Sequence, residues 1–298
     1  MIMMNNSGIL LYAKPVGVTS FSALYPIKKK FNKKTGHAGT LDKFAEGLLI
    51  VLLGKYTKLN SIFSGLDKVY EAVFYMGVET DTLDPEGAVI NKCQIPDIKL
   101  MENIIGNFIG KIQQVPPAYS AIHVNGKRAY QEIRSGRVPN LTPRDISIYD
   151  FNLIDWNPPY LKVRIHCSKG TYIRSLARDF GKACGSAAYV CKLLRTSIGS
   201  FSLENATNEN NLSEENILQG SDFFKDLPGF HLVEPTENEL LRLQYGTMPK
   251  TILTNFHDDL KDHYCVFQDK EGNVAGVSTL IADNNVLIPK KLLFSTTA

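Results

Sequence analysis

The stretch GHAGTLDKFAEGLLIVLLG, from Gly36 to Gly54, places one carboxylate, Asp42, between a glycine-rich turn that carries a histidine and an unbroken apolar run. The run Leu48 to Leu53 is apolar without alternation, which is typical of a strand buried on both faces. The glycines around Asp42 allow sharp bends or the close approach of a ligand. Asp42 is therefore a candidate active-site acid. A helix cap before Lys43 is the alternative, and on this segment alone it is the commoner role.

The composition is that of a globular protein with a sizeable core. The chain has 298 residues, 44% hydrophobic and 21% charged, which allows one large domain or one with a small second domain. The start, MIMMNNSG, has no secretory signal pattern, so a cytoplasmic location is expected. The apolar run is too short to cross a membrane. Five scattered cysteines without a C-x-x-C pair predict reduced thiols, and neither a disulfide framework nor a metal site is expected.

The net charge of +3 is unevenly distributed. Residues 1–60 hold nine Lys against two acidic residues, and residues 121–200 hold thirteen basic residues against five acidic ones. Two basic blocks favour a polyanionic partner. For the lysines of residues 28–34 alone, a solvated face is the better interpretation. The second block mixes arginines with aromatic residues, a combination suited to phosphates and unstacked bases: Tyr119, Arg128, Tyr130, Arg134, Arg137 and Arg144.

Local patterns predict both helices and strands. Strands are expected at 9–13, 48–53, 69–77 and 161–167, and helices at 98–109 and 173–184. Thr19-Ser20 predicts a helix start toward residue 30, which Pro26 should break or restart. Residues 204–226 are acidic and Asn-rich and suggest a surface connection with a short helix. Short strands at 264–268, 274–277 and 286–288 then indicate a small β-rich module from about residue 229.

Seven blocks, in order along the chain, resemble the tRNA pseudouridine synthase B (TruB) family. They cover most of the chain, and their order matters more than any single pattern. The blocks are KPVGVTS (14–20), GHAGTLD (36–42), KVY (68–70), the Gly77–Gly87 segment, QVPPAYSA with GKRAY (114–121 and 126–130), CSKGTYIR (167–174) and LLRT (193–196). The chain departs from the family pattern at Lys43, where proline is usual, and at Leu194, where arginine is usual.

The resemblance implies an α+β pseudouridine synthase fold. Its central sheet would be mixed but largely antiparallel, with flanking helices and loops. Residues 1–228 would form the catalytic domain, with an RNA-gripping insertion at about 117–145. Residues 229–298 would form a small β-rich C-terminal domain that faintly resembles the PUA type.

The resemblance also implies the reaction. The family converts a uridine of the tRNA T loop, position 55, into pseudouridine by breaking the N1–C1′ bond and rejoining the base through C5. No cofactor or metal is needed. The expected partner is the T stem-loop of tRNA, and a monomer is expected.

Residue roles follow from the matched blocks. Asp42 would be the nucleophile and Arg174 its cationic partner, Tyr70 would stack on the flipped base, and Tyr172 and Leu193 would line the pocket. His37 would support the flipped-out loop without acting as a base. The expected RNA contacts are Lys14, Arg128, Arg134, Arg137 and Arg144. Two alternatives stay open at this point: a noncatalytic RNA-binding or RNA-folding protein, and a pseudouridine synthase acting on another RNA site.

Overall fold

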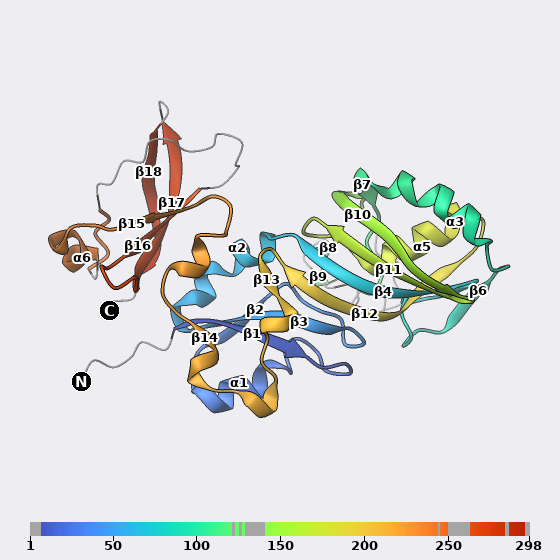
Figure 1. Ribbon diagram of the computed structural model, residues 1–298, viewed down its shortest axis with the longest axis horizontal. Coiled ribbons are helices and arrows are strands. Elements are labelled where there is room, and N and C mark those ends of the chain that lie inside the picture. The colour runs from blue at the N-terminus through green and yellow to red at the C-terminus, as the bar shows by residue number, and fades with distance from the viewer. Residues whose placement is uncertain are drawn as a thin grey trace.

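A ten-stranded sheet forms the body of the computed structural model (Figure 1). The structure describes residues 7–120, 123–124, 127–128, 141–243, 245–249, 263–283 and 286–295. The strand order is β14-β1-β3-β12-β4-β11-β10-β7, with β2 beside β3 and β13 beside β12. Their bounds are β1 Gly8–Lys14, β2 Thr35–Ala38, β3 Glu46–Leu53, β4 Lys68–Met76, β7 Gly110–Gln114, β10 Arg144–Asn157, β11 Tyr160–Cys167, β12 Ala188–Ile198, β13 Phe201–Ser202 and β14 Ile217–Leu218.

The expected α+β fold with a mixed, largely antiparallel sheet is confirmed. Within this sheet the one parallel pair of named strands is β3 with β12, and the other paired strands run antiparallel. At this crossing, Gly47 has a φ of +110°. A Cβ atom there would collide with the carbonyl oxygen of Arg195, so glycine lets the two strands meet. The contact brings the Asp42 loop close to β12.

The strand expected from the apolar run is confirmed as β3. Its residues Leu48 to Leu53 are each 0% exposed, because β1, β2 and β12 flank it and hydrophobic clusters lie on both faces. No helix begins at Lys43, so the capping alternative for Asp42 is wrong. Residues 43–44 form a bend, and the Ala45 amide donates to the Asp42 carbonyl at 3.2 Å.

Four of the described α-helices lie around this sheet, and the last in the chain lies beside the C-terminal strands (Figure 1). The described residues contain α1 (Leu24–Phe31), α2 (Asn60–Gly65), α3 (Ile98–Ile105), α5 (Ile173–Ala183) and α6 (Glu237–Leu243). In α5, Leu176, Ala177 and Phe180 are fully buried against the sheet. Pro26 does not break α1, because it lies in the first turn, where its missing N–H costs no helical bond.

Short elements complete the main body. The small strands are β5 (Val78–Thr80), β6 (Val89–Lys92), β8 (His123–Val124) and β9 (Lys127–Arg128). The 3-10 helices are η1 (Gly54–Leu59), η2 (Gly106–Phe108), η3 (Leu203–Asn205), η4 (Glu209–Asn211), η5 (Glu214–Asn216) and η6 (Asp222–Phe224). The segment expected to be a surface connection therefore contains 3-10 turns and also β14, which extends the sheet beside β1.

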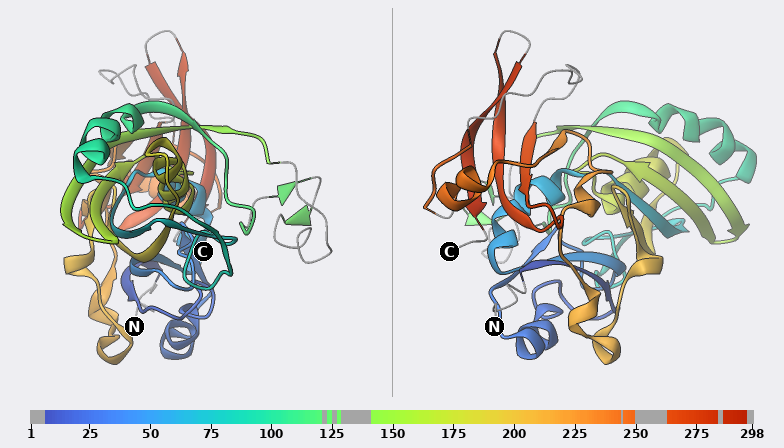
Figure 2. Two further views of the ribbon diagram at one scale, coloured as in Figure 1. Left: turned by 90° about the vertical axis from the view of Figure 1, so that its right-hand side faces the viewer. Right: turned by 60° about the vertical axis from the view of Figure 1, so that its left-hand side comes forward.

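A second sheet follows near the predicted boundary. It has the order β15-β16-β17-β18, with bounds Phe230–Val233, Tyr264–Gln268, Val274–Asp283 and Val286–Ser295, and it rises beside the main sheet (Figure 2). β17 and β18 are longer than expected. Val266 and Val277 share a core cluster with Ile9 and Tyr56 of the main body. The second sheet therefore shares one hydrophobic cluster with the main body and has another of its own, which includes Leu243, Cys265 and Phe267.

Candidate active site

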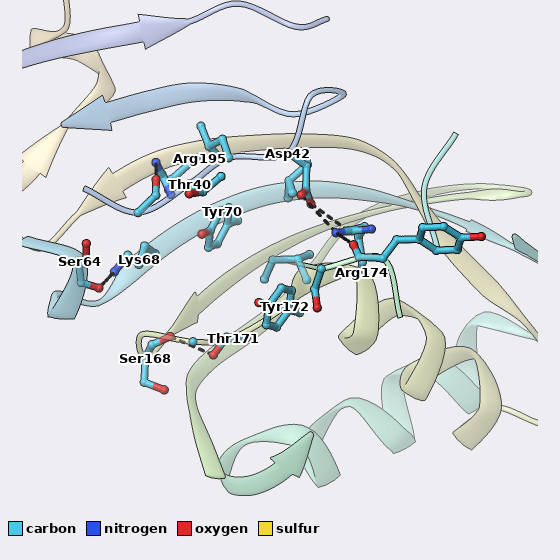
Figure 3. Close-up of a pocket in the computed structure, with 17 residues that line it drawn as sticks. Thr40, Asp42, Ser64, Lys68, Tyr70, Ser168, Thr171, Tyr172, Arg174 and Arg195 are labelled. Carbon is cyan, nitrogen blue, oxygen red and sulfur yellow. Dashed lines mark hydrogen bonds and ion pairs between the residues drawn. The ribbon is translucent and has the colours of Figure 1, made fainter. Parts of the chain in front are cut away.

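A cavity of about 510 Å³ opens where five segments of the chain meet (Figure 3). Five of the segments that line it are residues 39–42, Ser64 at the end of α2 with Lys68 and Tyr70 on β4, residues 119–120, residues 168–174 at the start of α5, and Leu193 with Arg195 on β12. This volume lies within the ordinary range for small-molecule sites. Four of the residues predicted as catalytic or substrate-binding, Tyr70, Tyr172, Arg174 and Leu193, line it together with Asp42.

The Asp42 loop is held on both sides of the carboxylate. Ser20 donates its hydroxyl to the Leu41 carbonyl at 2.9 Å and accepts from the Leu41 amide at 2.8 Å. On the other side, the Gly17 amide donates to the Lys43 carbonyl at 2.8 Å. The 14–20 turn therefore fixes the backbone before and after Asp42. Its side chain keeps 39% exposure, so it is open to a ligand in the cavity.

Arg174 lies in the first turn of α5 and contacts Asp42 at the edge of the cavity (Figure 3). Its Nε atom lies 2.8 Å from Oδ2 of Asp42, and its Nη2 atom donates to Oδ1 at 3.2 Å. The Arg174 side chain is only 5% exposed. Its remaining N–H groups donate to the carbonyls of Thr82 at 2.8 Å and Tyr119 at 3.0 Å. The guanidinium is thus locked in place and presents a two-point contact to Asp42.

Asp84 is a second carboxylate on the same guanidinium. Its Oδ2 atom lies 3.2 Å from Nη1 of Arg174, and its Oδ1 atom accepts from the Thr82 hydroxyl at 2.6 Å and from the Glu86 amide at 3.0 Å. Burial raises the pKa of Asp84, and the hydrogen bond from Thr82 and the charge of Arg174 oppose this shift. Sequence reasoning gave this residue no role, although it belongs to the matched Gly77–Gly87 block.

Two tyrosines and a leucine form the less polar part of the cavity. Tyr70 and Leu193 are both 7% exposed. Burial raises the pKa values of Tyr70 and Tyr172, so both phenols stay neutral near pH 7. The backbone of Tyr172 is fixed by Gln114, which accepts from its amide at 2.8 Å and donates to its carbonyl at 3.1 Å.

Lys68 and Arg195 add positive charge to the cavity, and sequence reasoning assigned a role to neither. The Lys68 ammonium donates to the carbonyls of Ser64, at 2.7 Å, and Leu66. Burial, aided by the charge of Arg195, lowers the pKa of Lys68 to about 8. Arg195 is 1% exposed and donates to the carbonyls of Leu48 and Gly39, each at 2.8 Å. The signal in the sequence was their place in two of the matched blocks, KVY (68–70) for Lys68 and LLRT (193–196) for Arg195.

His37 lies on β2 and is not among the residues that line this cavity. Its ring is partly buried, and burial, with a further contribution from Arg195, lowers its pKa. A neutral imidazole near pH 7 agrees with a supporting role and gives no sign of a charged contact to phosphate.

The residues expected to contact RNA are dispersed. Lys14 is 1% exposed, and its ammonium donates to the carbonyls of Pro15 at 2.8 Å and Val18 at 2.6 Å, so its placement supports a structural role in the 14–20 turn. Arg144 begins β10 at the surface, close enough to Tyr172 for its charge to oppose the rise that burial causes in the pKa of Tyr172. Arg128 is placed only as part of strand β9, while Arg134 and Arg137 lie outside the described residues.

The described part of the chain contains no group of three or more His, Cys, Asp or Glu side chains arranged to hold a metal ion. Within the same residues, no helix combines the length and the apolar character needed to span a membrane.

Comparisons with known proteins identify the family of this chain. Residues 28–173 match the model of the TruB family pseudouridylate synthase N-terminal domain. A protein of Borreliella afzelii named tRNA pseudouridine synthase B is 47% identical over 216 residues, covering 71% of this chain and 77% of its own. One of the same name from Treponema denticola is 35% identical and covers 94% and 91% of the two chains. With this fold, the matches define a pseudouridine synthase, an isomerase. The chain belongs to the TruB family of pseudouridylate synthases.

Solved structures share the architecture. A chain from the crystal structure of a Cbf5–Nop10–Gar1 complex superposes with a TM-score of 0.69 at 20% identity, covering 99% of this chain and 87% of that one. A chain from an H/ACA RNP bound to a substrate RNA containing 2′-deoxyuridine also gives 0.69, at 19% identity, covering 99% and 88%. At this identity, the likeness shows a common fold.

Proposed function

We propose that this enzyme converts the uridine at position 55 of the tRNA T loop into pseudouridine, with Asp42 as the nucleophile. The observation that carries the proposal is the partly exposed Asp42 carboxylate, held by the buried Arg174 at the wall of a cavity with two tyrosines. The tRNA substrate is supported by the name that relatives at 35–47% identity bear.

The reaction needs the target nucleotide outside its stack, because the reacting atoms cannot be reached within it. Extrusion costs a few kcal/mol, and stacking on an aromatic side chain returns about 1 to 3 kcal/mol. Tyr70 is the proposed stacking partner, and Tyr172 and Leu193 complete the pocket. Most of the extrusion cost is therefore offset before chemistry begins.

The carboxylate of Asp42 then attacks the bound nucleotide and forms a covalent bond to it. The N1–C1′ bond breaks, the uracil turns, a C5–C1′ bond forms, and the bond to Asp42 breaks, which restores the free carboxylate. C5 loses its proton and N1 gains one, so the product is an isomer and no oxidant or cosubstrate is consumed. Arg174 keeps the carboxylate in one orientation, which is a large part of what an enzyme supplies when nucleophile and substrate must meet at fixed geometry.

Release of tritium from C5 tests the chemistry. A tRNA transcript labelled with 5-tritiated uridine should release tritium with wild-type enzyme, whereas Asp42→Asn and Asp42→Ala should release none above background and bind the transcript with unchanged Kd. Release at a wild-type rate by Asp42→Asn would overturn the nucleophile assignment. The absence of release by wild-type enzyme would favour a noncatalytic RNA-binding or RNA-folding protein.

Mapping of the product separates position 55 from other sites. A transcript with cytidine at position 55 should contain no pseudouridine after treatment, while the unmodified transcript should contain one, in its T loop. Pseudouridine at another position, or in another RNA only, would assign the enzyme to a different substrate.

A further inference from the structure

The outer face of α1 combines aromatic rings and lysines that the active site does not use. Phe21, Tyr25 and Lys29 follow one another at four-residue spacing, so they share one side of the helix and the turn before it. Phe21 is 73% exposed and Tyr25 is 72% exposed. Aromatic side chains left this open bury little of their apolar surface in the fold, so their contribution to its stability is small.

The charged residues on α1 and next to it in the chain are all basic, whereas Glu209, which approaches Tyr25 from a distant segment, is acidic. No Asp or Glu precedes Asp42 in the sequence, whereas five lysines lie between residues 28 and 34. The Lys28 ammonium lies 5.0 Å from the centroid of the Phe21 ring, within the range of a cation–π contact. Lysines interleaved with exposed aromatic rings match the phosphates and bases of a nucleic-acid strand. The exposed rings are the feature that distinguishes this surface from a simple solvated lysine face.

A hollow of about 480 Å³ lies beside Tyr25. Lys29 and Lys30 line it from α1, and Glu209, Asn210 and Leu212 line it from the segment that contains η4; Figure 1 shows that segment beside α1. A ring wall can stack on a base, two ammonium groups suit a phosphate, and an amide and a carboxylate can bond the edge of a base. The hollow therefore has the size and the groups for one unpaired nucleotide.

This surface adjoins the active-site loop. The Gly17 amide bonds the Lys43 carbonyl, and the Ser20 hydroxyl bonds the Leu41 backbone. Phe21 follows Ser20 directly, and Val16, which precedes Gly17, is 60% exposed. An RNA that places one nucleotide against Asp42 can therefore continue onto α1.

We propose that the hollow beside Tyr25 binds an unpaired nucleotide of the substrate RNA that lies outside the target stem-loop. The inference rests on the proposed function, since it takes the substrate to be an RNA larger than that stem-loop. It predicts that the site contributes to binding of full-length tRNA and contributes nothing to binding of the isolated T stem-loop.

The test compares both RNAs by Kd, which reads binding without any need for turnover. With full-length tRNA, Tyr25→Ala should raise Kd about fivefold or more, the lower bound of a lost stack. Lys29→Glu with Lys30→Glu should raise it further and reduce the salt slope by about one to two. Tyr25→Phe should bind as the wild type does. With the isolated stem-loop, every variant should match the wild type.

The matched control is Lys92→Glu with Lys99→Glu, the same charge change at exposed positions on β6 and α3, far from α1 (Figure 1). It should leave both Kd values unchanged. Equal losses in the control and the α1 variants, equal losses with both RNAs, or no loss with full-length tRNA would each overturn the site. Failure of the proposed function would appear separately, as wild-type enzyme that forms no pseudouridine in either RNA.

Discussion

Arg174 and Asp42 meet through two contacts, of 2.8 and 3.2 Å, although they are 132 positions apart in the chain. The same guanidinium lies 3.2 Å from the carboxylate of Asp84. Arg174 therefore forms ion pairs with the partly exposed carboxylate of Asp42 and with the buried carboxylate of Asp84. The ion pair with Asp84 helps to fix the position of the guanidinium that contacts Asp42.

Replacement of Arg174 by Met should destabilise the fold. It leaves Asp84 buried without its cation, which costs about 3 kcal/mol in the free energy of unfolding, the low end for a broken buried pair because Asp84 can protonate. Adding Asp84→Asn should recover part of this loss. Urea denaturation of the single and double variants measures it, and equal destabilisation of both would show that Asp84 does not depend on Arg174.

The loss of stability caused by Arg174→Met should depend on pH. Burial raises the pKa of Asp84 in the folded protein. The Asp84 carboxyl therefore binds a proton more readily in the folded state than in the unfolded state, and the free energy of unfolding increases as pH falls through the folded-state pKa. Loss of Arg174 removes a charge that opposes the shift. The destabilisation by Arg174→Met should therefore be smaller at pH 5 than at pH 7, and a larger loss at pH 5 would contradict this.

Ser20→Ala should slow catalysis more than it weakens RNA binding. The substitution removes both bonds to the Leu41 backbone and leaves a buried amide and carbonyl unpaired, at a cost of about 1 to 3 kcal/mol. Because the loop then holds Asp42 less firmly, we expect kcat to fall about tenfold with Kd unchanged. Thr19→Ala is the matched control, since that exposed hydroxyl bonds only locally, to Ser22. Equal rates for the two variants would remove the positioning role.

Tyr70 can be tested without opening a large cavity. Tyr70→Phe keeps the ring and should retain most of the single-turnover rate, whereas Tyr70→Leu keeps apolar volume but loses the stacking face. The rate of the Leu variant should fall about fivefold or more, from the value of one stacked base. Thermal unfolding checks that both variants fold. Similar rates for Phe and Leu would exclude stacking as the role of Tyr70.

Lys68 should make RNA affinity sensitive to alkaline pH. Its pKa is lowered to about 8 by burial, so the cavity loses this positive charge as pH rises through about 8, and affinity should weaken there. The folded state releases the proton before the unfolded state does, so Lys68 also makes stability rise with pH between about 8 and 10.5. Lys68→Arg should bind RNA with a flatter pH profile. If Lys68→Arg and the wild type showed the same dependence of RNA affinity on pH, titration of Lys68 would not govern binding.

Local elements were largely predictable. The unbroken apolar run became β3, and the alternating segments became β4 and β11, because burial periodicity is written in neighbouring residues. The region before β15 was less predictable. Its strand β14 forms by pairing with β1. No local sequence pattern predicts this pairing between distant segments.

The candidate site was predicted in part, through matched blocks. Asp42, Tyr70, Tyr172, Arg174 and Leu193 do meet at one cavity. Lys14 shows the limit of this approach, because a lysine in a glycine-proline turn suggests a surface charge until the fold encloses it. His37 was expected to support the flipped-out loop; it lies on β2 and does not line the cavity, and its supporting role stays a prediction.

The sequence by itself determined the class of fold, the apolar strand beside Asp42 and the order of the blocks that identify the family. Only the tertiary structure decided that Asp84 holds Arg174, that Ser20 holds the Asp42 loop, and that Lys68 and Arg195 lie in the cavity. These outcomes depend on hydrogen bonds and burial between segments far apart in the chain. Strand register and the packing of α5 set those contacts, and neither is encoded in a local stretch of residues.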